Sequence, residues 1–212
     1  MNDVDPDFWR ARWGEGRIGF HEGAPNALLR KHLSVLGERK RVFVPLCGKA
    51  EDLAFLAAQG HQVVGVELVE SAVQAFFAEH GVTPVVTQRA GFVEYSAQNI
   101  TVFAGDYFAC TREVLGEVSA FYDRAAVIAL PESLRGPYVK LLRALVPVRS
   151  PGLVITVEYP QEQMAPPPFS VPETELRAHY AGARLECVEQ VKAEGPRLGA
   201  IAAVEKCFTV KL

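Results

Sequence analysis

The sequence of 212 residues has little cysteine, and the cysteines it has are scattered. Cys47, Cys110, Cys187 and Cys207 lie far apart, without a CxxC pair and without a histidine at the spacing of metal ligands. We therefore expect neither a disulfide framework nor a zinc site, and no metal in the functional site.

Long hydrophobic runs and an excess of charge of one sign are also missing. No apolar stretch approaches the roughly 18 residues of a membrane-spanning helix, and the first residues lack the pattern of a signal peptide. The formal net charge is only -3, with basic and acidic residues intermixed, which favours neither nucleic acid nor a membrane surface as a partner. We expect a cytoplasmic protein that binds a small molecule.

Apolar runs alternate with amphipathic patterns along the chain, which at 49% hydrophobic is long enough for one well-packed domain over residues 1–212. Strands are expected at 41–46, 62–67, 100–104, 120–122 and 153–158, and helices at 3–13, 25–36, 50–59, 69–80, 132–146 and 173–180. Pro25 and Pro131 suit the starts of two helices. The alternation predicts an α/β fold, a Rossmann-like doubly wound sheet that is mostly parallel. Runs of period two at 184–192 and 201–211 suit an antiparallel pair at the sheet edge.

The turn after the first expected strand has one glycine where a dinucleotide-binding turn carries three. It consists of PLCGKAEDL, with Gly48 followed by Glu51 and Asp52 in the first helical turn. A pyrophosphate is bound by G-x-G-x-x-G at a helix N-terminus, and these two carboxylates would repel it. The turn therefore favours a ligand without phosphate.

An acidic residue ends the second expected strand. Glu67 stands 19 positions after Gly48, where a carboxylate can accept hydrogen bonds from both hydroxyls of a ribose. S-Adenosylmethionine combines a ribose with a cationic sulfonium and no phosphate, so it fits this turn better than NAD does.

Polar residues follow two further strands, at the sheet edge where ligands of such folds bind. Asp106 and Tyr107 in GDYF can reach the adenine side, and Asp123 and Arg124 begin YDRAAVIALP. Asp106 is equally compatible with a turn residue. Arg124 is compatible with an ion pair to Asp123 or to a nearby glutamate, but its place at a strand end favours a functional role.

Several motifs along nearly the whole chain resemble the thiopurine S-methyltransferase family of class I S-adenosylmethionine-dependent methyltransferases. They are FWRARW, IGFH, VPLCGKAEDLAFLAAQGHQVVGVEL, AVQAFFAEHGV, GDYF, YDRAAVIALP and YPQEQMAPPPFSVPETEL. Their combination and spacing are far more specific than a single glycine motif.

The resemblance implies a role for individual residues. Trp9 and Trp13 would help to close an N-terminal lid (residues 1–36) over the cofactor. Leu46 and Gly48 would pass along its methionine part, Glu67 would hold its ribose, and Asp106 and Tyr107 would flank its adenine. Arg124 would lie near both cofactor and acceptor and act as the catalytic residue. Phe20 and Arg197 would face the acceptor, although the loop after Arg197 is shorter than in the family's usual pattern.

Other interpretations of these residues remain open. The i, i+4 spacing of Trp9 and Trp13 also suits core packing, and His21 suits a loop residue as well as a base. Cys47 has no neighbouring base in the sequence, which favours a buried filler over a nucleophile. The prolines at 166–168 suit either a stiff connector or a wall for a flat acceptor.

The leading hypothesis is methyl transfer from S-adenosylmethionine to the sulfur of an aromatic or heterocyclic thiol, with selenium or tellurium compounds as further acceptors. A thiol of this kind is acidic enough to ionise near neutrality, so Arg124 would favour the anion and no strong base is needed. The rival hypotheses are a methyltransferase for a phenol, halide or amine, a non-catalytic cofactor-binding module and an NAD-dependent oxidoreductase. No unpartnered helix face is evident, so we expect a monomer.

Overall fold

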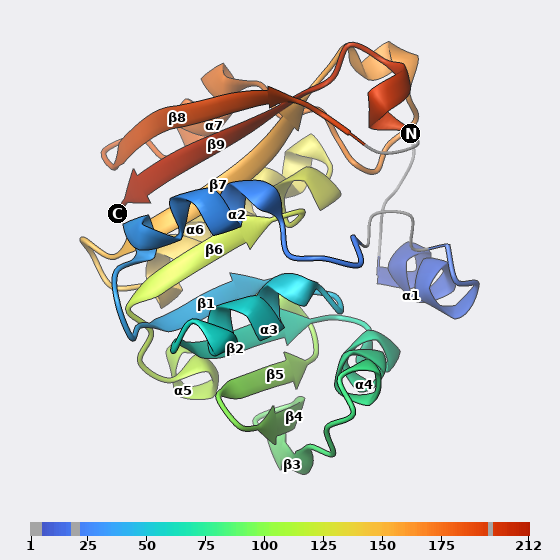
Figure 1. Cartoon of the computed structure of the whole chain (residues 1–212), viewed down its shortest axis with the longest axis vertical. Coiled ribbons are helices and arrows are strands. Elements are labelled where there is room, and N and C mark those ends of the chain that lie inside the picture. Colours follow the sequence, from blue (N-terminus) through green and yellow to red (C-terminus); the bar gives the residue numbers. More distant parts are fainter. Residues whose placement is uncertain (1–5, 18–21, 195–196) are drawn as a thin grey trace.

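The computed structural model describes residues 6–17, 22–194 and 197–212. Nine strands in these ranges form a single sheet with helices packed on both of its faces (Figure 1). The strands are β1 (Arg41–Pro45), β2 (Gln62–Glu67), β3 (Val85–Arg89), β4 (Phe92–Ala97), β5 (Ile100–Ala104), β6 (Ala120–Arg124), β7 (Pro151–Glu158), β8 (Arg184–Lys192) and β9 (Val204–Lys211).

The strand order is β3-β4-β5-β2-β1-β6-β7-β9-β8. The five central strands, β5, β2, β1, β6 and β7, are parallel, while the pairs at both edges are antiparallel. The chain winds outward from β1 in one direction and then returns to β6 and continues in the other. The strand order therefore reverses between β1 and β6, and in such sheets the ligand binds beyond the carboxyl ends of the strands at this point.

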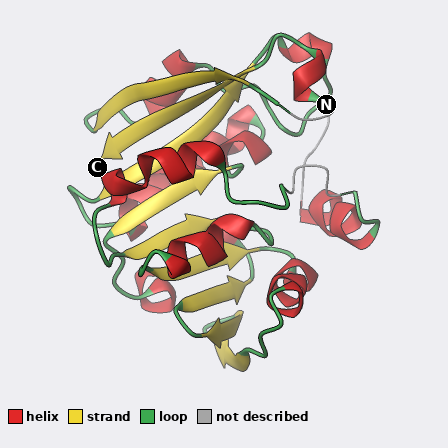
Figure 2. Cartoon of the chain, viewed as in Figure 1, coloured by secondary structure: helices red, strands yellow, loops and turns green. Residues whose placement is uncertain are grey.

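Helices cover the two faces of the sheet in separate layers (Figure 2). α2 (Ala27–His32), α3 (Glu51–Ala58) and α4 (Glu70–Glu79) pack their apolar side chains on one face. α5 (Arg112–Leu115), α6 (Glu132–Leu145) and α7 (Glu173–His179) pack on the other. Short 3-10 helices lie at Leu33–Leu36, Tyr107–Ala109, Val127–Ala129, Gln161–Gln163 and Leu198–Ala200.

The helix α1 (Pro6–Gly14) belongs to neither layer. It lies beyond the carboxyl ends of the strands, has no fully buried residue and touches α4 (Figure 1). An element placed there covers the expected ligand site rather than the sheet.

The predicted fold class is confirmed, including the antiparallel pair at the C-terminal end, where β9 pairs with β7 and β8 forms the edge. The hairpin of β3 and β4 was not predicted. The placement of Pro25 at the first helical position was wrong. α2 begins at Ala27, and the Asn26 side chain before it accepts hydrogen bonds from the backbone N–H groups of Leu28 and Leu29, as an N-cap does.

Among the residues that the structure describes, no helix is both long enough and apolar enough to cross a lipid bilayer.

Candidate active site

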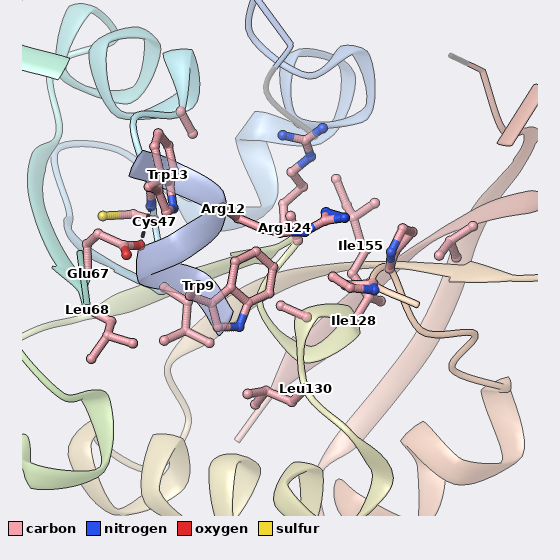
Figure 3. A pocket seen from close by; sticks show the side chains of 18 of the residues that line it. Trp9, Arg12, Trp13, Cys47, Glu67, Leu68, Arg124, Ile128, Leu130 and Ile155 are labelled. Carbon is pink, nitrogen blue, oxygen red and sulfur yellow. Dashed lines mark hydrogen bonds between the residues drawn. The ribbon is translucent and has the colours of Figure 1, made fainter. Parts of the chain in front are cut away.

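A cavity of about 700 Å³ lies at the carboxyl ends of the central strands, beneath α1 (Figure 3). This volume falls within the range of small-molecule and cofactor sites. Loops after β1, β2, β5 and β6 line one part of it, and β7, β9 and the proline-rich loop line the rest. The cavity therefore coincides with the reversal of strand order.

Nine of the ten residues selected from the sequence line this one cavity. They are Trp9, Trp13, Leu46, Gly48, Glu67, Asp106, Tyr107, Arg124 and Arg197. The tenth, Phe20, lies outside the described residues, as does His21.

The turn from β1 into α3 is shaped by close contacts to glycine. Gly48 has φ of 53°, in the left-handed region, and a Cβ built on it would lie 3.1 Å from Cζ2 of Trp13. The indole of Trp13 therefore rests directly on the turn. Cys47 is buried, burial raises the pKa of its thiol, and its sulfur fills the space that a side chain at Gly65 would occupy. These findings agree with a packing role for Cys47.

The carboxylate of Glu67 is buried at the end of β2, only 6% exposed. One oxygen accepts a hydrogen bond from the backbone N–H of Gly48 and the other from that of Val69, both at 2.8 Å. Burial raises the pKa of Glu67, and these backbone donors partly counteract the rise. Each oxygen has a further lone pair, so the carboxylate can still accept hydroxyl donors from a ligand.

Asp52, in the first turn of α3, holds three segments together. It is buried, accepts the backbone N–H of Asn26 at 2.7 Å, and accepts the hydroxyl of Tyr122 on β6 at 3.0 Å. Burial raises the pKa of Asp52, although the nearby Arg124 lowers it. The carboxylate thus fixes the segment before α2 against the sheet.

The residues after β5 have different roles, at the cavity and in the core. Asp106 caps the 3-10 helix by accepting the backbone N–H of Phe108 at 2.9 Å, and it also lines the cavity. Tyr107 is 1% exposed, and its hydroxyl donates to the backbone carbonyl of Tyr138 at 3.0 Å, so most of its ring serves the core. The aromatic ring open to a ligand at this corner is that of Phe108, which is 40% exposed and was not predicted.

Arg124 ends β6 in the middle of the cavity (Figure 3). Its guanidinium donates to the carboxylate of Glu22, from the segment that leads into α2. Burial lowers the pKa of Arg124, but Tyr122, Glu22 and Asp52 raise it by more, so the net pKa is raised and the cation persists. Arg124 and Glu22 do form an ion pair, at a place that a ligand can also reach.

The far part of the cavity has apolar walls. Ile128 and Ile155 form one side, and Pro167 and Pro168 form another. Arg197 donates to the backbone carbonyls of Pro167 and Ala165, at 2.9 and 2.6 Å, and so holds the proline-rich loop in place. Pro167 and Pro168 thus line the cavity, and their contact with a flat acceptor stays a prediction.

Several lining residues were not found from the sequence, among them Arg12, Leu68, Phe108, Leu130 and Glu205. Arg12, Leu68 and Phe108 are next in sequence to residues that were predicted, and this proximity could have indicated them. Glu205 lies within β9, and only the pairing of β9 with β7 brings it to the cavity.

Solved structures with this architecture include methyltransferases. One is magnesium protoporphyrin IX methyltransferase from Synechocystis PCC 6803 with bound S-adenosylhomocysteine, with a TM-score of 0.64 at 12% identity, covering 98% of this chain and 99% of that one. Another is 1,6-didemethyltoxoflavin-N1-methyltransferase from Burkholderia thailandensis, with a TM-score of 0.61 at 18% identity, covering 98% and 87%. The fold is that of the class I methyltransferases.

The relatives in sequence narrow this class. The model of the thiopurine S-methyltransferase family matches residues 4–209. A thiopurine S-methyltransferase of Pseudomonas aeruginosa is 51% identical over 190 residues, 88% of this chain and 87% of that protein, and one of Pseudomonas putida is 42% identical over 214 residues, 98% and 99%. The chain belongs to the thiopurine S-methyltransferase family, whose cofactor is S-adenosylmethionine.

Proposed function

We propose that this protein transfers a methyl group from S-adenosylmethionine to the sulfur of an aromatic or heterocyclic thiol. The observation that carries the proposal is the position of Arg124, a largely buried cation between the Glu67 end of the cavity and its apolar end. Relatives named thiopurine S-methyltransferase, at about half identity over most of the chain, support the same acceptor class.

The residues around Glu67 suit S-adenosylmethionine. Its buried carboxylate has lone pairs left for ribose hydroxyls, and the apolar and aromatic surfaces of Leu68 and Phe108 lie beside it for a base. A carboxylate, Asp52, is buried in the first turn of α3, where a pyrophosphate-binding helix would present free N–H groups. The site therefore favours a ligand with a ribose and no phosphate.

We assign the remaining contacts with the cofactor and the acceptor as follows. Cofactor contacts are assigned to Trp9, Trp13, Leu46, Gly48, Glu67, Asp106, Tyr107 and Arg124, and acceptor contacts to Phe20 and Arg197. Residues 1–36 would act as the lid of a single domain that spans 1–212. The position of α1 over the cavity and the contact of Trp13 with Gly48 support the lid.

When bound, S-adenosylmethionine supplies a methyl group on a cationic sulfur that also serves as the leaving group. The protein's own task is to hold the two partners in line and to exclude water. Arg124 would stabilise the thiolate form of the acceptor by charge and by its forked donors. The anion would take the place of the Glu22 carboxylate on Arg124, and α1 would cover the site. Exclusion of water strengthens the attraction between the anion and the cationic donor.

Selenium or tellurium compounds would enter by the same route, as soft anions at the same arginine.

We also propose that the protein works as a monomer in the cytoplasm, with a small-molecule acceptor and without nucleic acid or membrane as a partner. The low and mixed charge supports this.

The test is turnover of labelled S-adenosylmethionine with 6-mercaptopurine, beside a phenol, an amine, iodide and a selenite-derived acceptor. Methylation of the thiopurine should exceed that of the phenol and amine. The variant Arg124→Ala should lower kcat/KM for the thiopurine by about a hundredfold, because a charged hydrogen bond of up to about 3 kcal/mol is lost. Arg177→Ala, which alters an exposed arginine on α7, is the matched control.

If the protein methylates a phenol, a halide or an amine faster than the thiopurine, the proposed acceptor class is wrong and the preferred compound takes its place. If the protein binds S-adenosylmethionine but methylates no acceptor, the hypothesis of a non-catalytic cofactor-binding module stands. If it binds NADH and not S-adenosylmethionine, the oxidoreductase hypothesis is favoured.

A further inference from the structure

A carboxylate on β9, that of Glu205, lies on the acceptor side of the cavity and has no part in the function proposed above. In the pairing of β7 with β9, Glu205 stands opposite Val157, and in the pairing of β6 with β7, Arg124 stands opposite Ile155. Paired residues point to the same face of a sheet, and residues two apart in a strand share that face. Arg124, Ile155, Val157 and Glu205 therefore line one continuous surface.

The surroundings of Glu205 leave its oxygens available. None of the described residues donates a hydrogen bond to this carboxylate, which is only partly exposed. Burial raises the pKa of Glu205, Arg124 lowers it, and Glu22 and Glu194 raise it again. A carboxylate in this setting is a better proton acceptor than one in water.

The spacing between Arg124 and Glu205 suits a flat ring system. Two strand spacings across the sheet and two residues along it separate their Cα atoms by about 12 Å. Side chains that extend inward from both positions leave room for a fused heterocycle against Ile155, with Pro167 and Pro168 on another side. The sulfur of such an acceptor would face Arg124 and a ring nitrogen would face Glu205.

Heterocyclic thiones differ chemically from simple thiols. In the thione form the proton sits on a ring nitrogen next to the C=S carbon rather than on sulfur. Methylation of the sulfur leaves a cationic ring unless that N–H proton departs. An aryl thiol ionises at sulfur itself and needs no such proton acceptor.

We propose that Glu205 accepts the ring N–H proton of a heterocyclic thione during methyl transfer, and so makes thiones with an adjacent N–H its preferred acceptors. This rests on the proposed function. The acceptor sulfur forms a bond to the methyl carbon while the bond from that carbon to the donor sulfur breaks, with its electron pair staying on the donor. The N–H electron pair becomes part of a ring C=N bond, and the proton passes to Glu205 and later to water.

The first test compares two acceptors in two variants. With 6-mercaptopurine, Glu205→Gln should lower kcat/KM by about a hundredfold, the usual contribution of a general base. With thiophenol the same variant should lose far less, which also reports that it is folded. The control is Glu186→Gln, an exposed glutamate on the neighbouring strand β8, which should lose nothing with either acceptor.

Equal losses with both acceptors, or no loss with either, would overturn the assignment while leaving the proposed function intact. If the wild-type protein methylates neither acceptor, the proposed function fails and the role of Glu205 fails with it.

The second test measures binding without turnover. In the presence of S-adenosylhomocysteine, calorimetry should show weaker binding of 6-mercaptopurine to Glu205→Gln and unchanged binding of thiophenol, because only the thione donates to residue 205. A tenfold loss corresponds to about 1.4 kcal/mol. Unchanged binding of 6-mercaptopurine would contradict the contact.

Discussion

At the scale of single residues, Glu67 has a structural role at the end of β2 and is also the residue proposed to bind the ribose. Its two oxygens hold the backbone of Gly48 and Val69, which shapes the turn after β1 and the start of α4. The same carboxylate is the assigned ribose contact. Loss of the charge should therefore affect the fold and the affinity together.

The variant Glu67→Gln tests this double role. The amide NH2 of glutamine would face one of the two backbone N–H groups, so at least one buried donor loses its partner, at a cost of about 1–3 kcal/mol in the free energy of unfolding. The affinity for S-adenosylmethionine should fall about tenfold to a hundredfold, since charged hydrogen bonds contribute about 1.5–3 kcal/mol. Urea unfolding and titration calorimetry measure the two effects.

The control is Glu70→Gln, which alters a glutamate at the start of α4 that accepts the hydroxyl of Tyr95. Its affinity for the cofactor should match that of the wild type. An unchanged affinity in Glu67→Gln itself would refute the ribose contact.

Among the individual residues of the site, those that end strands were predictable from sequence. Glu67 and Arg124 follow apolar runs, and the carboxyl ends of parallel strands share one edge of the sheet. Glu205 was not predictable, because its proximity to Arg124 depends on the register of β7 with both neighbours. The burial of Tyr107 was also not predictable, because an aromatic residue after a strand can either pack in the core or contact a ligand.

At the scale of elements, α1 contacts the turn after β1, where the proposed lid would meet the sheet. Trp13 rests on Gly48, and Gly48 in turn donates its N–H to Glu67. Two other residues at the cavity, Leu46 and Ala125, have φ of 46° and 62°, so left-handed backbone also occurs where β1 and β6 end. Strain of this kind is typical of binding sites.

The substitution Gly48→Ala should disturb this contact. An alanine at φ of 53° costs about 1 kcal/mol of stability, and its Cβ would press against the Trp13 ring at 3.1 Å. We expect weaker binding of S-adenosylmethionine and a shift in the fluorescence of the tryptophans.

The matched control is Gly60→Ala, after α3. Gly60 has φ of 87° but nothing within 4 Å of a built Cβ, so it should lose similar stability and no affinity. Equal affinities of the two variants would argue against a role in cofactor binding for the contact between α1 and the turn.

The elements themselves were predictable to the extent that they are buried, on both faces for the central strands and on one face for the helices. The five central strands are apolar runs, and helices ending in glycine separate several of them. The strand β3 escaped prediction because all its residues are exposed, so it has no alternation of buried and exposed positions. Its turn to β4, at Ala90 and Gly91, lacks the Asn-Gly or Asp-Gly sequence that marks a hairpin.

At the scale of the whole molecule, several acidic groups are buried or partly buried. The pKa values of Asp52, Glu67, Asp123 and Glu205 are all raised, chiefly by burial. A carboxyl whose pKa is higher in the folded state binds its proton more tightly there than in the unfolded chain. Its contribution to stability is therefore complete at low pH and is lost as the pH rises through the folded-state pKa.

Asp123 gives the clearest case. Burial raises its pKa from 3.8 to about 6, with the Tyr138 hydroxyl and the Val127 N–H opposing the rise. Wild-type stability should fall between about pH 4 and pH 6 on account of this group. Between pH 4.5 and 7.5, urea unfolding should show Asp123→Asn gaining about 2 kcal/mol relative to the wild type, since each pKa unit corresponds to about 1.36 kcal/mol.

The comparison variant is Asp7→Asn, whose carboxylate is exposed on α1. It should stay parallel to the wild type over the same pH range. A constant difference between Asp123→Asn and the wild type would mean that Asp123 is ionised in the folded protein throughout.

The most direct test of the whole account is the position of the transferred methyl group. The protein is given 6-mercaptopurine and S-adenosylmethionine labelled with ¹³C in its methyl group, and the product is identified by carbon NMR and mass spectrometry. The account predicts one labelled product, methylated on sulfur. A product methylated on a ring nitrogen, or no labelled product while the cofactor binds, would contradict it.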